Sequence, residues 1–147
     1  MDDKEIIRAL NAVVKVEAMA VQIYRAQMWR FRGRQEIAER LVHATANERK
    51  HFDDLTSRVR DLGSTPSRLS PLFAVAGWIM GLLPALAGKV PALNLDIWVE
   101  ERAVRDYQGF LNVVNFDDES RALMEKNMVD EEEHIRAWKE SIELLRS

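Results

Sequence analysis

The chain contains an internal repeat: residues 16–51 match residues 99–134 when the numbering is shifted by 83, with identical residues at eight positions. Two unrelated segments of this length would share about two identical residues, given ordinary amino-acid frequencies. The identical pairs include the polar side chains that we place on the core side of the fold: Glu17/Glu100, Tyr24/Tyr107, Glu48/Glu131 and His51/His134. The repeat therefore predicts two copies of one folding unit that bury the same polar groups.

Helical periodicity identifies this unit as a hairpin of two helices. Apolar residues recur three and four positions apart, and long stretches are rich in the helix-favouring residues Ala, Leu, Glu, Arg and Lys. We expect helices at about 4–31, 35–62, 96–114 and 120–145. A chain of 147 residues with 47% apolar side chains can bury one substantial core. We predict a single all-α domain over 1–147, made of a first hairpin (1–62), an apolar crossover segment (63–95) and a second hairpin (96–147).

Each hairpin carries one Glu-x-x-His motif and one further glutamate. Residues three apart share a helix face, so each motif presents a carboxylate and an imidazole to the same point. A glutamate from each of two helices plus Glu-x-x-His from each of the other two is the ligand set of ferritin-like di-iron and di-manganese proteins. Oxygen and imidazole ligands suit iron or manganese, and four carboxylates balance two divalent ions. The sequence thus predicts a ferritin-like four-helix bundle with two Fe ions, or alternatively Mn, held by Glu17, Glu48, His51, Glu100, Glu131 and His134.

An ordinary structural role is the alternative for any one of these residues, because a single Glu-x-x-His on a helix is usually a solvated pair. The complete set argues otherwise, since four inward carboxylates without a counter-ion would repel one another and lose hydration, at a cost of roughly several kcal/mol each. Tyr24 and Tyr107 are candidate catalytic residues. An inward tyrosine two turns from a ligand is more often a core residue with a satisfied hydroxyl group, so packing is the favoured role for both.

Composition excludes several other classes of protein. The chain has no cysteine, which rules out disulfides, thiolate nucleophiles and zinc–thiolate sites. Its net charge of -3 argues against a nucleic-acid partner, which would require a basic face. The acidic start, Met-Asp-Asp-Lys-Glu, does not resemble a secretory signal, so we expect an intracellular protein. No flavin or nucleotide fingerprint is present, and electrons for redox chemistry must then come from an external reductant or from the substrate.

The segment between the hairpins is apolar on every side. Residues 71–88, PLFAVAGWIMGLLPALAG, run for eighteen residues without a charge and are flanked by basic residues on both sides. Pro84 and three glycines weaken a straight membrane-spanning helix, and both ends must rejoin one bundle. We expect a helix that lies in one leaflet with Trp78 near the interface. A dimer interface, and hence a homo-oligomer, or a buried crossover helix is the alternative.

The order of these features resembles the demethoxyubiquinone hydroxylase family. The resemblance rests on Glu17 with IYRAQ at 23–27, the two Glu-x-x-His motifs, and PLFAVAGWIMGLLPALAGK at 71–89 followed by VEERAVRDY at 99–107. Two features depart from the family pattern: Asp106 stands where the family commonly has His, and Ala18-Met19-Ala20 replaces a small, glycine-containing segment.

The resemblance implies a di-iron monooxygenase that uses O2 to hydroxylate the ring of a demethoxyubiquinone-like polyprenyl quinone. In this role Glu48 and Glu131 bridge the ions, and Glu17 and Glu100 are terminal ligands. Residues 71–90 form a membrane-facing channel for the quinone, and the protein is peripheral on the inner, cytoplasmic membrane face. The alternatives are a rubrerythrin-like peroxidase or oxygen scavenger and a non-catalytic ferritin-like iron-binding protein.

Overall fold

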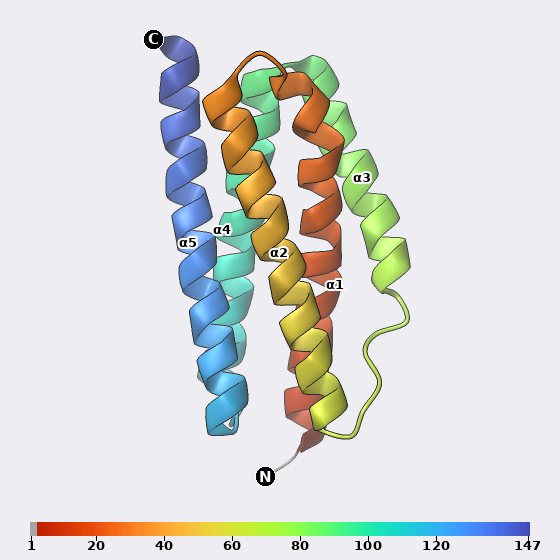
Figure 1. The fold of residues 1–147 in the computed structure, drawn as a ribbon. Coiled ribbons are helices and arrows are strands. Elements are labelled where there is room, and N and C mark those ends of the chain that lie inside the picture. The colour runs from red at the N-terminus through yellow and green to blue at the C-terminus, as the bar shows by residue number, and fades with distance from the viewer. Residues whose placement is uncertain (1–2) are drawn as a thin grey trace.

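The computed structural model describes residues 3–147, and every regular element in this range is helical. The elements are α1 (Asp3–Gln27), the 3-10 helix η1 (Met28–Phe31), α2 (Gln35–Asp61), α3 (Ser70–Ala87), α4 (Lys89–Val113) and α5 (Asp118–Arg146). Four long helices, α1, α2, α4 and α5, form a bundle, and α3 packs on the outside of α1 (Figure 1). The all-α prediction is confirmed.

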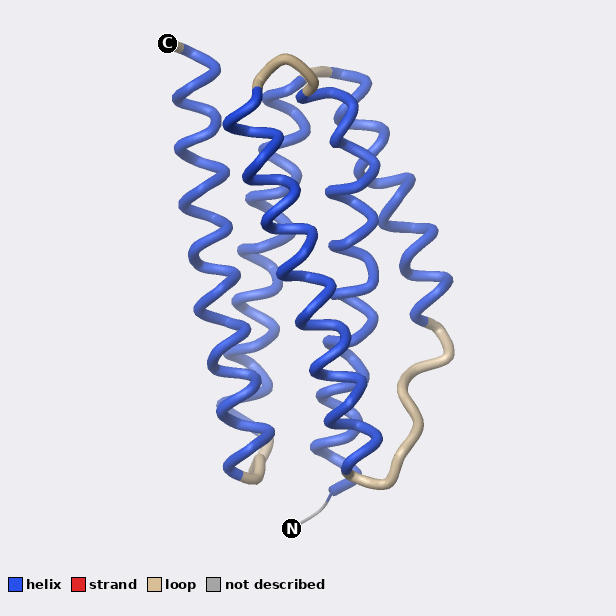
Figure 2. The backbone as a smooth tube through the Cα atoms, viewed as in Figure 1, coloured by secondary structure: helices blue, strands red, loops and turns tan. Residues whose placement is uncertain are grey.

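The chain path explains why a fifth helix is needed. The helices of each pair, α1 with α2 and α4 with α5, are antiparallel and joined by short turns (Figure 2). The loop after α2 leads into α3, which runs back along the bundle so that α4 starts at the same end as α2 (Figure 1). One long crossover between two hairpins is the connectivity of ferritin-like bundles.

Helix α4 begins earlier than predicted, at Lys89 rather than near Asp96, and only Gly88 separates it from α3. The prediction treated Pro91 as part of the crossover segment 63–95. Proline is tolerated in the first turn of a helix because the first backbone N–H groups have no intrahelical partner. The apolar helix therefore ends at Ala87, and the predicted start of the next helix near Asp96 is wrong.

The core consists of two apolar clusters, one toward each end of the bundle. One cluster includes Leu10, Leu55, Tyr107 and Met124, and the other includes Ile23, Leu41, Leu93 and Trp138. On each of the four long helices, the predicted metal ligands lie between residues of the first cluster and residues of the second. The bundle thus has a polar layer enclosed by hydrophobic packing at both ends.

Two glycines allow α3 to approach α1 more closely than side chains would permit. A Cβ atom at Gly77 would lie 2.2 Å from the backbone oxygen of Met19, and one at Gly81 would lie 2.4 Å from that of Ile23. Glycines four residues apart let two helix backbones come into contact, as in small-xxx-small interfaces. This contact fixes which face of α3 is turned toward the bundle.

The opposite face of α3 is apolar and exposed, with Leu72, Val75, Ile79, Leu83 and Leu86 between 49% and 65% exposed. Among residues 3–147, α3 is the one helix long and apolar enough to cross a membrane, judged by length and composition alone. A hydrophobic stripe of this kind on a monomer indicates an interaction surface.

The Gly77 contact predicts a specific loss of stability. Gly77→Ala should lower the free energy of unfolding by about 1–3 kcal/mol, because the added methyl group meets backbone that cannot rotate away. Urea unfolding followed by circular dichroism measures the change.

Gly109→Ala is the matched control, because a Cβ there meets no atom within 4 Å. Replacing glycine within a helix should raise stability by up to about 1 kcal/mol. Equal effects of the two substitutions would contradict the close packing of α3 on α1.

Candidate metal centre

The structure brings all six predicted ligands into the layer between the two apolar clusters. The four long helices all contribute ligands: Glu17 lies on α1, Glu48 and His51 on α2, Glu100 on α4, and Glu131 and His134 on α5. All six residues are buried, with at most 5% of any of them exposed. The duplicated hairpins therefore each contribute half of one internal site.

These residues form two overlapping groups of four that share Glu48 and Glu131. Glu17 and His51 complete the first group, and Glu100 and His134 complete the second. Within each group the potential ligand atoms lie within 4.8 Å of one another. The arrangement can hold two metal ions, with one carboxylate from each hairpin able to contact both.

Three of the potential metal-ligand atoms point into the site without an aligned hydrogen bond. Glu48 Oε1, Glu131 Oε1 and His51 Nδ1 are buried and make no aligned hydrogen bond. Glu131 Oε1 nevertheless lies 3.2 Å from His51 Nδ1, and Glu48 Oε1 lies 2.9 Å from His134 Nδ1. Buried polar atoms are almost always paired, so converging donors without aligned partners fit a metal-binding role.

Burial perturbs the carboxyl groups strongly. It raises the pKa of Glu17 to about 8, and the charge of Glu48 adds to the shift. It raises the pKa of Glu131 to about 7, with contributions from Glu100 and Glu17. The pKa of Glu100 is also raised, chiefly by burial. In the metal-free protein these three carboxyl groups therefore bind protons more readily than exposed glutamates do.

The two histidines respond in the opposite sense to their surroundings. Burial alone would lower the pKa of both imidazoles, but the surrounding carboxylates raise it above the ordinary value. For His51 the largest of these contributions comes from Glu131, and for His134 it comes from Glu100. The carboxylates around each imidazole therefore favour its protonated form in the metal-free protein.

The two candidate catalytic tyrosines connect the halves of the site. The Tyr107 hydroxyl group donates to Glu17 Oε1 at 2.5 Å, and the Tyr24 hydroxyl group donates to Glu100 Oε1. Each tyrosine therefore binds the glutamate of the other hairpin. Both are buried and also accept a hydrogen bond, Tyr24 from Trp138 and Tyr107 from Asn127. Their position satisfies the requirements of core packing and also places a hydroxyl group against a predicted ligand.

Two residues that the sequence analysis did not identify contact the outer edges of the histidine rings. His51 Nε2 lies 2.9 Å from Asp130 Oδ2, and His134 Nε2 lies 3.4 Å from Asn47 Nδ2. Asn47 and Asp130 are related by the same shift of 83 residues, each directly before its Glu-x-x-His motif. That repeated polar position is the signal from which they could have been predicted.

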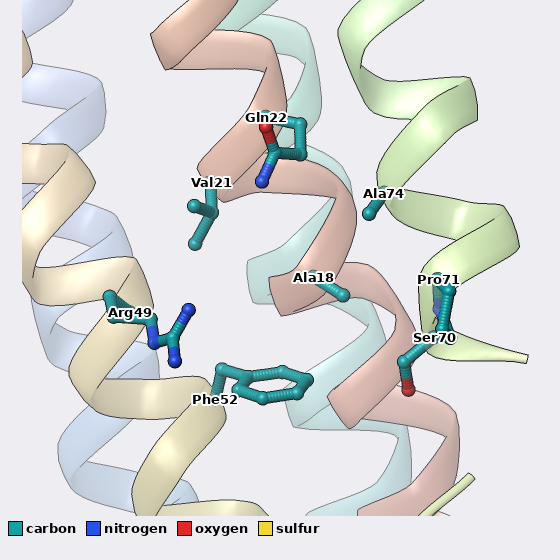
Figure 3. Close-up of a pocket in the computed structure, with 8 residues that line it drawn as sticks. All are labelled: Ala18, Val21, Gln22, Arg49, Phe52, Ser70, Pro71 and Ala74. Atoms are coloured by element: carbon teal, nitrogen blue, oxygen red, sulfur yellow. The ribbon is translucent and has the colours of Figure 1, made fainter. Parts of the chain in front are cut away.

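A cavity of about 180 Å³ lies between α1, α2 and α3. Figure 3 shows Ala18 and Val21 of α1, Arg49 and Phe52 of α2, and Pro71 of α3 around it. Ala18, Arg49 and Phe52 directly follow the predicted ligands Glu17, Glu48 and His51 in the sequence. The cavity is therefore bounded by residues that follow three of the predicted ligands in the sequence and by the inner side of α3.

Comparison with known proteins gives matches along most of the chain. The family model described as ubiquinone biosynthesis protein COQ7 matches residues 4–144. The 3-demethoxyubiquinol 3-hydroxylase of Pseudomonas putida (strain W619) is 31% identical over 67% of this chain and 46% of its own length. The enzyme of that name from Polynucleobacter asymbioticus is 30% identical over 82% of this chain and 58% of its own length. The chain spans about half the length of such relatives.

A solved structure supports the fold independently. The bacterioferritin-related protein from Bacteroides fragilis, described as a dodecameric thioferritin, superposes with a TM-score of 0.80. The match covers 99% of this chain and 89% of the Bacteroides chain at 21% sequence identity. The predicted ferritin-like architecture is confirmed.

The raised carboxyl pKa values predict the pH dependence of the metal-free protein. A carboxyl group whose pKa is raised on folding stabilises the folded state at low pH, and this contribution is lost as pH rises through the folded value. Metal-free protein should therefore become less stable to urea as pH rises from about 5 to about 8, the window set by Glu17 and Glu131. Divalent metal should reverse the slope because it requires deprotonated ligands.

The variant Glu17→Gln should flatten the metal-free slope, because one of the shifted groups is removed. Glu132→Gln, an exposed position next to the site, should leave it unchanged. Metal-free stability that stays level or increases over the same pH range would show that the carboxyl groups are not clustered as described.

Proposed function

Because the chain belongs to the ubiquinone biosynthesis protein COQ7 family, we propose that it is a di-iron monooxygenase that hydroxylates the ring of a demethoxyubiquinone-like polyprenyl quinol. The observation that carries this proposal is the pair of four-residue groups that share Glu48 and Glu131. Such a pair is built for two ions held close together, as the reduction of O2 by two metals requires. The names of the matched relatives supply the substrate class.

In the proposed site, Glu48 and Glu131 would be the ligands shared by two iron ions. Glu17 and His51 complete one position, while Glu100 and His134 complete the other. A bound iron pair would supply electrons for the cleavage of O2, one atom of which is transferred to the ring. Conversion of a ring C–H to C–OH with O2 consumes two electrons and two protons and releases water, so an external reductant is the proposed partner.

The tyrosines hold the terminal ligands in place. Tyr24 donates to Glu100 and Tyr107 donates to Glu17, so each hydroxyl group fixes one carboxylate and leaves its other oxygen for a metal. Asn127 and Trp138 in turn fix the direction of the two hydroxyl groups. We assign both tyrosines a positioning role at the terminal ligands.

The cavity between α1, α2 and α3 is the proposed entrance for the quinol ring. Its walls are mostly apolar, with Ala18, Val21, Phe52 and Ala74 among them, which suits a ring with a polyprenyl tail. The guanidinium group of Arg49 lies 5.7 Å from the centre of the Phe52 ring and supplies donors for a ring oxygen atom. The polyprenyl tail would then extend out of the cavity along α3.

The exposed stripe of α3 is the proposed membrane contact. The outward leucine, isoleucine and valine side chains of α3 enter one leaflet, while Arg68 and Lys89 at the two ends of the helix meet anionic head groups. The protein is accordingly placed inside the cell, peripheral on the inner, cytoplasmic face of the membrane. The substrate reaches the cavity without leaving the lipid.

The function predicts a product and a metal content that depend on the shared carboxylates. Protein loaded with Fe(II) without oxygen should carry about two irons per chain, and on exposure to O2 it should hydroxylate a short-chain demethoxyquinol analogue. The double variant Glu48→Ala/Glu131→Ala should lose both the iron pair and the product, because it removes both shared ligands. Iron analysis and mass spectrometry of the quinol provide the two measurements.

Glu132→Ala/Glu133→Ala is the matched control, because both side chains are exposed on the same helix. It should retain iron and product. Full iron occupancy in the Glu48/Glu131 variant would exclude these residues as ligands, and O2 consumption without hydroxylated product would instead favour an oxygen scavenger.

The membrane contact predicts a separation of anchor and site. Ile79→Glu/Leu83→Glu should lower binding to anionic liposomes at least about tenfold, since a charge in the apolar part of a bilayer is disfavoured by roughly 2.5–3.5 kcal/mol at its centre and less near the interface. Activity on a long-tailed quinol should fall, while activity on a short-chain analogue and the iron content should be retained.

Val42→Glu/Val129→Glu is the control for added charge, because these exposed valines lie on α2 and α5. It should bind liposomes like the unmodified protein. If the α3 variant also binds liposomes normally, and instead loses self-association, the stripe is an interface between copies of the chain.

A further inference from the structure

The two halves of the metal centre are equivalent in every ligand but differ in the outer partner of the histidine. Both imidazoles turn Nδ1 into the site: His51 Nδ1 lies 3.2 Å from Glu131, and His134 Nδ1 lies 2.9 Å from Glu48. Both terminal carboxylates receive a tyrosine hydroxyl group. Beyond the rings the symmetry ends, because Asp130 faces His51 and Asn47 faces His134.

Asp130 is well suited to serve a histidine that binds metal through Nδ1. Such a ring carries its proton on Nε2 and needs an acceptor there. The Asp130 carboxylate lies 2.9 Å from His51 Nε2 and is itself held by Lys126 Nζ at 2.7 Å. A carboxylate acceptor makes a charge-assisted hydrogen bond and increases the electron density that the imidazole offers to a metal.

Asn47 offers His134 a weaker partner. Its amide is neutral, and the atom nearest to His134 Nε2 is the donor nitrogen Nδ2, at the longer distance of 3.4 Å. When Nδ1 binds a metal, two N–H groups would face each other, so Asn47 serves the ring only after its amide turns Oδ1 toward it. The resulting hydrogen bond lacks the charge that Asp130 supplies.

We propose that Asp130 and Asn47 are positioning residues that make the two metal positions unequal, so that the ion beside His51 is held more tightly than the ion beside His134. This inference rests on the metal pair proposed above. Ala18 and Phe52, which line the proposed entrance cavity, directly follow Glu17 and His51 of the tighter position in the sequence. The looser position is the one that fills last and exchanges its ion first.

Stepwise titration of metal-free protein with Co²⁺ under argon tests the inference. Binding is monitored by calorimetry and by the visible absorption of bound cobalt. The unmodified protein should bind two ions in separate steps with affinities that differ by about 10–100-fold, the usual effect of an outer partner of a ligating histidine. His51→Ala should remove the tight step, and His134→Ala should remove the weak step.

Exchange of the outer partners gives the decisive comparison. Asn47→Asp should strengthen the weak step about tenfold or more and bring the two steps together, whereas Asp130→Asn should weaken the tight step by a similar factor. The double exchange Asn47→Asp/Asp130→Asn should restore two separate steps, but the ion beside His134 should now bind more tightly. Adding His51→Ala should then remove the weak step, and adding His134→Ala should remove the tight step. A purely structural role would weaken both steps in every variant and could not reverse their order.

Asp53→Asn provides a control, because it makes the same chemical change at an exposed ion pair with Arg49. It should leave both steps unchanged. Circular dichroism of each metal-free variant identifies any that fail to fold, and for those Asn47→Glu or Asp130→Gln, which makes the same change of charge, is titrated with the same expected result.

The outcomes separate this inference from the proposed function. Two equal affinities in the unmodified protein, or an Asn47→Asp titration identical to it, would overturn the inequality and leave the metal pair intact. Binding of fewer than two ions by the unmodified protein would overturn the metal pair itself.

Discussion

The structure depends on the burial of four carboxylates in one layer of a helical bundle. Isolated buried charges are strongly disfavoured, and these groups lie close enough to repel one another. The two inward imidazoles provide partial compensation, and two divalent ions would complete it. The apolar clusters on either side of the layer exclude water from it, which strengthens every electrostatic interaction within the site.

The duplication produces a site that neither hairpin could form alone. Tyr24 and Tyr107 each bind the glutamate of the other hairpin, and each histidine has its outer partner on the other hairpin. These reciprocal contacts tie the two halves together at the layer where repulsion between carboxylates is greatest. Assembly of the bundle and assembly of the site are therefore one event.

Helix α3 has one face against the bundle and one face exposed to the outside. Gly77 and Gly81 bring one of its faces against α1, and that contact turns the large apolar side chains outward. The same helix forms one wall of the cavity between α1, α2 and α3. A surface suited to lipid and one wall of the proposed substrate entrance thus belong to one element.

The sequence alone predicted the helical class and which side chains would meet, because helical periodicity and the 83-residue repeat are local patterns that survive in one dimension. The start of α4 was misplaced: the helix begins at Lys89, with Pro91 in its first turn, where proline is tolerated. The outer partners Asp130 and Asn47 depend on how the hairpins dock, as do the tyrosine contacts and the outward face of α3. Distances between helices are set by packing, so only the tertiary structure decided which of these side chains contact one another across the two hairpins.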